Sequence, residues 1–299
     1  MNNSPKIIIN ADDLGFSPQV NSAILRCAEQ GTVTAASVMV NMPFAEDALR
    51  QVQRRMPQLS LALHFTLTSG KPVNSPRDIP LLVDADGFFR LGFLGLWKAL
   101  TTSKEKTVLL QQIQTELSAQ LHQMDQLSEK YQSRFDHLDS HQHVHVLPGI
   151  WELLQQEAEQ RRLSLRVPHE RWGTLTRLCR RGWKWFPQGL LKRAILNRCL
   201  RNVPQQIGYF GILETGRMDA SALRWIIQSV GQCSTFAAYE INTHPSATAE
   251  INNGMGLCCS EADKQFHTSP WREREFQALN CCDIFSWAQQ CRVELGGFS

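Results

Sequence analysis

No apolar run in this sequence approaches the roughly 18 to 20 uncharged residues of a membrane span, so no transmembrane helix is expected. The opening residues, MNNSPKIIINADD, lack the basic start and the long apolar stretch of a secretory signal. The nine cysteines contain no C-x-x-C pair, which excludes the usual spacing of zinc-finger and thioredoxin sites. We therefore expect a cytoplasmic protein with reduced thiols.

Glycine and proline are also too scarce for a collagen-like or low-complexity chain, with 18 and 13 residues among 299. The hydrophobic content of 42% is ordinary for a globular protein and sufficient for a sizeable core. The length fits one large domain or two average ones. We expect a single domain over residues 1–299, with a basic, tryptophan-containing segment resembling an insertion at about 171–205.

Short apolar runs alternate with longer amphipathic stretches along the chain. This β-α-β-α order favours a parallel sheet joined by helical crossovers and predicts a barrel-like α/β fold. In such folds the functional side chains gather at the carboxyl ends of the strands. Strands are expected at 6–10, 35–40, 59–65, 135–146, 163–167 and 236–242, and helices at 18–30, 45–55, 106–131 and 148–161.

Polar side chains follow two of these strands. Asp12 and Asp13 come directly after the first strand. Two adjacent carboxylates are costly to place together unless a cation or a proton offsets their repulsion. The alternative is that they cap the next helix. His64 ends the third strand, where it is either a packed core histidine or a metal ligand.

Five of the nine histidines fall within residues 137–169. Packing so many imidazoles together has little structural benefit, so a metal or acid/base site is favoured. If 135–146 is a strand, its side chains alternate between two sides. Taken together with Asp12, Asp13 and His64, this run supplies one aspartate and two histidines for a divalent metal site with open positions for water and substrate. The residues expected to share one side are Asp139, His141, His143 and His145.

Two more expected strand ends carry functional groups. His244 lies in EINTHP, where it is either an acid/base group or an ordinary loop histidine. Arg166 lies in LRVPHE, where it either holds a buried carboxylate in its ionised form or lies on the surface of a basic region.

The motifs NADDLG, LALHFTLTSG, DHLDSHQHVH, LRVPHE and EINTHP occur in this order along the chain. Together they resemble the YdjC-like carbohydrate deacetylases, a family that includes the chitooligosaccharide deacetylases. The resemblance covers about residues 5–250 and implies a distorted (β/α) barrel related to the polysaccharide deacetylases. Two further stretches, LVDADGFFR and FGILETGRM, resemble the branch of the family associated with hopanoid biosynthesis.

The resemblance also implies a role for each of these polar residues. Asp12 would be the general base, oriented by Arg166, and His244 would be the general acid. The strand pattern by itself leaves the third metal ligand open among the histidines of residues 141–145, and the resemblance favours the first of them. The implied metal ligands are Asp13, His64 and His141, and the implied substrate-binding residues are His143, His145 and Glu170.

The implied reaction is hydrolysis of an acetamide. One divalent metal ion, zinc or magnesium first and manganese, cobalt or nickel as alternatives, would polarise the carbonyl and lower the pKa of a bound water. Asp12 would accept a proton as water attacks, and His244 would protonate the departing amine. The substrate would be an N-acetylated sugar or glycoconjugate, and the products acetate and an amino sugar.

Residues 161–201 carry twelve lysines or arginines against one acid, Glu170, and therefore contribute +11. Since the net charge is +3, the remainder of the chain carries −8. Trp172, Trp183 and Trp185 are interleaved with this charge, so the segment is either a solvated helical face or an interfacial segment that meets anionic lipid. The second interpretation suits a lipid-linked amino sugar, such as a hopanoid glycolipid, and attachment to the inner face of a membrane. No nucleic-acid partner is expected, because the rest of the chain is acidic.

Two other functions stay open from the sequence. Another metallohydrolase, such as a phosphoesterase, would commonly use two metals and more carboxylates than these motifs supply. A non-catalytic membrane-surface binding protein on the same fold would not need to keep all of these polar groups. A homodimer is the default assembly, because it is the commonest one.

Overall fold

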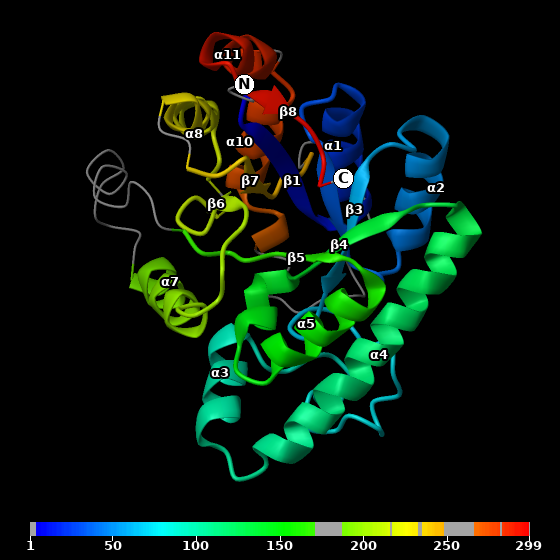
Figure 1. The fold of residues 1–299 in the computed structure, drawn as a ribbon. Helices are drawn as coiled ribbons and strands as arrows, with labels where there is room; N and C mark the ends of the chain where they lie inside the picture. The colour runs from blue at the N-terminus through cyan, green and yellow to red at the C-terminus, as the bar shows by residue number, and fades with distance from the viewer. Residues whose placement is uncertain are drawn as a thin grey trace.

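A computed structural model of the chain describes residues 4–170, 187–215, 217–232, 235–247, 266–281 and 283–298. Within these residues, seven parallel strands form one sheet in the order β5-β4-β3-β2-β1-β7-β6, and an eighth strand, β8, pairs with the start of β1. The sheet curls into a distorted half-barrel surrounded by helices (Figure 1). The strands are β1 Lys6–Leu14, β2 Ala35–Val38, β3 Ser60–Phe65, β4 Phe135–Ser140, β5 Ser164–Leu165, β6 Gly208–Phe210, β7 Ala238–Thr243 and β8 Glu294–Leu295.

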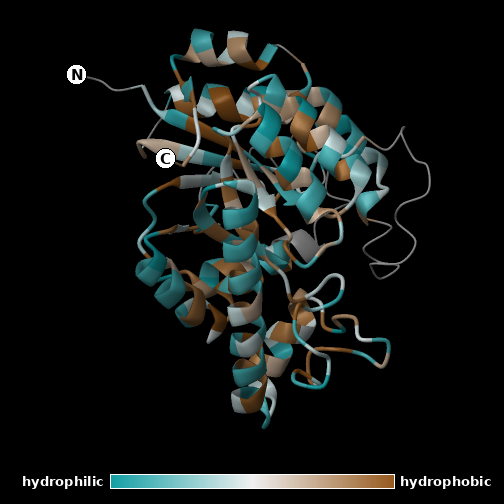
Figure 2. Cartoon of the chain, turned by 90° about the vertical axis from the view of Figure 1, so that its right-hand side faces the viewer, coloured by the Kyte–Doolittle hydropathy of each residue, from teal (hydrophilic) through white to brown (hydrophobic). Residues whose placement is uncertain are grey.

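The helices cover the sheet and place their apolar faces against it. In Figure 2, the helices turned to the viewer alternate between hydrophilic and hydrophobic residues, as expected for helices that cover a core with one face. Among the described residues, no helix combines the length and the apolar character that a membrane crossing requires. The helices are α1 Pro18–Glu29, α2 Ala45–Arg55, α3 Phe93–Thr102, α4 Lys106–Tyr131, α5 Ile150–Arg161, α7 Pro187–Cys199, α8 Ala220–Gln232, α10 Pro270–Leu279 and α11 Asp283–Cys291.

Local sequence explains where α1 begins. The Ser17 hydroxyl accepts a hydrogen bond from the backbone N–H of Val20 at 3.2 Å, and Pro18 occupies the first turn, where its missing N–H costs nothing. The helix ends at Glu29, two residues before Gly31, whose φ of 78° favours glycine.

The longest helix, α4, also holds the loop that follows β3. Its buried Gln120 accepts a hydrogen bond from the backbone N–H of Thr66 at 3.0 Å and donates one to the carbonyl of the same residue at 2.7 Å. Glu116, one turn earlier, accepts from the backbone N–H of Val73 at 2.9 Å. These bonds fix the chain on the carboxyl side of His64, the last residue but one of β3.

Most expected elements are confirmed to within four residues at each end, but the strand expected at 135–146 is wrong beyond Ser140. There the chain turns into a short 3-10 segment, η1, at His141–Val146. Gln142 and His143 both adopt left-handed backbone angles, with φ of 57° and 59°, and two such residues in succession end the extended conformation. The alternation argument therefore fails for the three histidines of this segment.

The basic segment is described only in part. Residues 171–186, with Trp172, Trp183 and Trp185, lie outside the described residues, and α7 supplies the part that follows them. Elements that the sequence did not predict are α3, β6, α8, α10, α11 and β8.

Candidate active site

The site lies at the carboxyl edge of the sheet, because parallel strands bring their carboxyl ends to the same edge. Asp12 and Asp13 lie within the last three residues of β1. His64 is the last residue but one of β3 and is paired in register with Asp139 of β4. His244 directly follows β7. All of these side chains are buried.

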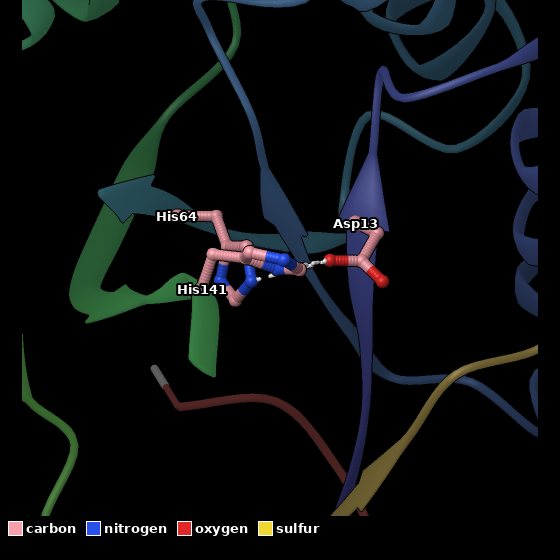
Figure 3. Close-up of side chains that lie close together, drawn as sticks. All are labelled: Asp13, His64 and His141. Atoms are coloured by element: carbon pink, nitrogen blue, oxygen red, sulfur yellow. Dashed lines mark hydrogen bonds and ion pairs between the residues drawn. The ribbon is translucent and has the colours of Figure 1, made fainter. Parts of the chain in front are cut away.

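Asp13, His64 and His141 form a compact group that can hold a cation. Oδ1 of Asp13 lies 2.9 Å from Nδ1 of His141 and 3.4 Å from Nε2 of His64 (Figure 3). Ligand atoms of the three residues lie within 4.8 Å of one another. Nε2 of His64 is buried and has no hydrogen-bond partner in the described part of the chain. An unpartnered imidazole nitrogen beside a carboxylate oxygen fits a divalent metal ion.

Asp139 fixes the orientation of the His64 ring. Its Oδ1 lies 2.7 Å from Nδ1 of His64, so Nδ1 donates and Nε2 is left to face Asp13. A carboxylate behind a histidine is the usual support for a metal-binding imidazole. Burial opposes the charged form of His64, but Asp139, Asp12 and Asp13 outweigh it and raise the pKa of the imidazole to about 10. The surrounding carboxylates thus favour a positive charge at this point, carried by a proton or by a metal ion.

A second group, Asp12, His64 and Asp139, also has ligand atoms within this spacing. Both of its carboxylates are already paired with Arg166, whose Nη2 lies 3.0 Å from Oδ1 of Asp12 and 2.7 Å from Oδ2 of Asp139. A metal ion there would face this guanidinium cation. The group with Asp13 is therefore the better metal site, because Oδ1 of Asp13 faces two imidazoles.

Asp12 lies beside the cation site in a dense set of donors. Arg166 donates to both of its oxygens, Asn10 donates to Oδ1 at 2.9 Å, and Asn242 donates to Oδ2 at 3.0 Å. Burial would raise the pKa of Asp12, but Arg166, His64 and His244 outweigh it and lower that pKa. Asp12 is therefore ionised at neutral pH.

His244 approaches the same carboxylate from β7. Its Nε2 lies 3.7 Å from Oδ2 of Asp12, and within the described residues its Nδ1 has no hydrogen-bond partner. Burial lowers the pKa of His244 to about 4 in spite of the nearby Asp12 and Asp13, so the imidazole is neutral near pH 7.

Comparison with known proteins identifies the family of the chain. The sequence profile of the YdjC-like proteins matches residues 6–290. The chain belongs to the YdjC-like family. Because the match spans β1 to α11, it includes every residue of the site described above.

Named relatives align with about half of this YdjC-like chain. A carbohydrate deacetylase of Brevibacillus brevis is 37% identical over 54% of the chain and 59% of its own length. One of Geobacillus stearothermophilus is 38% identical over 53% and 58%, and a chitooligosaccharide deacetylase of Salmonella typhimurium is 35% identical over 55% and 60%. The chain thus spans less than two thirds of the length of these curated relatives.

A solved structure shares the fold. The crystal structure of a candidate cellobiose-phosphate cleavage protein of Enterococcus faecalis V583 superposes with a TM-score of 0.71. The superposition covers 98% of this chain and 97% of the other, at 22% sequence identity. At this identity it supports the α/β distorted barrel alone.

The three residues expected to bind substrate are held by contacts within the protein, and their binding of substrate stays a prediction. His145 uses both ring nitrogens, with Nδ1 2.5 Å from the Ser140 hydroxyl and Nε2 donating to the carbonyl of Arg166 at 3.0 Å. Glu170 is buried, and its carboxylate accepts from the backbone N–H of Leu213 at 3.2 Å. His143 is 3.4 Å from the Tyr209 hydroxyl, and burial lowers its pKa well below the usual value.

The structure adds site residues that no motif had indicated. Arg272 donates to Oδ2 of Asp13 at 2.9 Å, and Glu275 accepts from the backbone N–H of His244 at 2.6 Å. Lys192 of α7 lies close enough to Asp12 for their charges to interact, although burial lowers its pKa to about 8. The sequence around these residues does not indicate their contacts, because their partners are distant in the chain.

Proposed function

We propose that this YdjC-like protein is a metal-dependent hydrolase that removes the N-acetyl group from an N-acetylated sugar or glycoconjugate. The observation that carries the proposal is the unpartnered Nε2 of His64 facing Oδ1 of Asp13, with His141 on the same oxygen. The names of the relatives, carbohydrate deacetylase and chitooligosaccharide deacetylase, support the reaction and the class of substrate.

Asp13, His64 and His141 would hold the metal ion. When bound, a divalent ion supplies Lewis acidity for an amide carbonyl and for water. Two imidazole nitrogens and one carboxylate favour zinc, manganese, cobalt or nickel over magnesium, which prefers oxygen ligands. Since His64 must lose its proton to become a ligand, binding is expected to release protons.

The neighbouring residues then move one proton. Asp12, kept ionised by Arg166, accepts a proton from the attacking water. His244 is neutral beforehand and lies 3.7 Å from Asp12, so it can receive that proton and deliver it to the departing amine. Water and an N-acetyl amide are thereby converted into acetate and an amine.

The substrate part of the proposal includes a lipid-linked sugar presented at an anionic membrane. It is supported by the +11 charge of residues 161–201 and by α7, on which Leu191 is 48% exposed and Arg198 is also exposed. Flotation with anionic and with neutral vesicles at low salt tests this part separately. Absence of binding to anionic vesicles would leave a free sugar as the substrate.

The deciding experiment combines elemental analysis of the purified protein with acetate release from a panel of N-acetylated sugars and glycolipids. We expect one metal ion per chain, and loss of both metal and acetate release in Asp13→Ala. The control is Asp86→Asn, at an exposed position. A wild-type protein without metal after reconstitution would contradict the proposal and favour a binding protein. A metal-loaded protein that releases phosphate, but no acetate, would favour a phosphoesterase.

A further inference from the structure

Helix α10 places two buried charged residues against the site from the C-terminal part of the chain. Arg272 and Glu275 lie three positions apart on its inner face and are fully buried, whereas Arg274 on the outer face is exposed. The helix begins at Pro270 and packs against α1 and α8. Burying an arginine and a glutamate costs free energy of folding unless each of them has a charged or hydrogen-bonding partner.

Arg272 gives the two oxygens of Asp13 different partners. Its Nη1 lies 2.9 Å from Oδ2, while Oδ1 faces His141 at 2.9 Å and His64 at 3.4 Å. Asp13 also has an unusual backbone, with φ of 73°, a region that non-glycine residues rarely adopt. Both the backbone and Arg272 thus hold this carboxylate in one orientation.

The guanidinium of Arg272 is poorly satisfied apart from this contact. Its Nε and Nη2 are buried and have no hydrogen-bond partner among the residues that the structure describes. Its Cζ lies 4.9 Å from the centre of the Phe266 ring, which is a weak interaction for a buried cation. Unsatisfied buried donors reduce stability, so an arginine kept here for stability alone would be a poor choice.

We propose that Arg272 is a positioning residue for the metal site: by holding Oδ2 of Asp13 it makes Oδ1 the oxygen offered to the metal ion. The inference rests on the proposed metal binding by Asp13, His64 and His141. Arg272 itself touches neither the metal nor the substrate. Its effect is on how strongly, and with what coordination geometry, the metal is held.

The test measures metal binding directly and needs no substrate. Zinc affinity of the metal-free full-length protein is measured by competition with a coloured chelator, and the visible spectrum of the cobalt form reports the ligand geometry. The variants are Arg272→Gln and Arg272→Lys. The matched controls are Arg274→Gln and Arg274→Lys, which make the same changes on the exposed face of the same helix. Circular dichroism and thermal unfolding establish which variants are folded.

We expect Arg272→Gln to bind zinc about ten-fold or more weakly, as when other supports of a metal ligand are removed, and to change the cobalt spectrum. Arg272→Lys keeps the charge but replaces the planar guanidinium with a compact ammonium group of shorter reach, so it should lose less, about three-fold. Both Arg274 variants should match the wild type. If Arg272→Gln does not fold, the zinc affinity of Arg272→Lys, compared with that of the wild type, decides the test.

A folded Arg272 variant with wild-type zinc affinity and cobalt spectrum would overturn the inference while leaving the metal site intact. Failure of the wild-type protein to bind zinc or cobalt would instead overturn the proposed function on which the inference rests.

Discussion

Arg166 binds both carboxylate oxygens of Asp12, with Nη1 3.2 Å from Oδ2 and Nη2 3.0 Å from Oδ1. The same Nη2 lies 2.7 Å from Asp139 and 2.6 Å from Glu240. One buried guanidinium therefore lies among three carboxylates from β1, β4 and β7. Because this cation also holds the pKa of Asp12 down, the stability of the barrel and the ionisation of the proposed base depend on the same side chain.

Replacing this arginine should destabilise the fold strongly. Arg166→Gln leaves buried carboxylates without their cation, and breaking such a buried pair typically costs about 3–5 kcal/mol. Urea unfolding measures the loss. The control is Arg161→Gln, because Arg161 pairs with Asp125 and Glu157 at the surface, where the same change should cost about 1 kcal/mol or less. Equal losses in the free energy of unfolding would show that the buried ion pairs of Arg166 stabilise the fold no more than the surface pairs of Arg161.

Removing the charge of Asp12 should separate metal binding from turnover. Asp12→Asn keeps the shape of the side chain but cannot accept a proton, so acetate release should fall by about 100-fold or more. Elemental analysis should find the metal content unchanged, because Asp12 lies outside the group of Asp13, His64 and His141. The prediction fails if this variant keeps both its metal and near-normal activity.

His64 should be required for metal binding itself. In His64→Ala the imidazole held by Asp139 is gone, so two of the three proposed ligand residues are left. Elemental analysis should show loss of the metal ion. His122→Ala is the matched control, since His122 is an exposed histidine of α4. An unchanged metal content in the His64 variant would refute the assignment.

Much of the fold could be predicted from local pattern, and the helix at Lys106–Tyr131 was predicted to the residue. Apolar residues along one face determine such a helix, so no distant contact is needed to predict it. The turn at Gln142 and His143 could not be predicted, because neither residue is the glycine that a left-handed backbone favours.

The same distinction applies to the site. Asp13 and His64 could be singled out because each lies at the carboxyl end of an apolar run, and parallel strands bring such ends together. Arg272 and Glu275 could not be, because their contacts with Asp13 and with the backbone of His244 depend on how α10 packs against α1 and α8. Asp139 was expected on the same side as the histidines that follow it, but it instead lies behind His64.

Burial and two hydrogen bonds hold His145 as a neutral residue. Nε2–H donates to the carbonyl of Arg166, and Nδ1 lies 2.5 Å from the Ser140 hydroxyl. Burial lowers its pKa to about 4, from 6.5 in an unfolded chain. Between these two values the unfolded chain takes up a proton that the folded chain does not. The stability from neutral His145 is therefore present above pH 6.5 and is lost as the pH falls from 6.5 towards 4.

This contribution should be visible in the pH dependence of unfolding. From about pH 7 to about pH 5, His145 should account for a loss of ~2 kcal/mol in the free energy of unfolding, and His145→Gln should lack that part of the loss. His244 has its pKa lowered in the same direction, so it contributes in both proteins and cancels in the comparison. Urea unfolding at the two pH values measures the difference, with His122→Gln as the control for loss of an exposed imidazole. If the His145 variant loses as much stability on acidification as the wild type, His145 is not held neutral by the fold. A role in binding substrate would then be the better interpretation of this residue than a structural one.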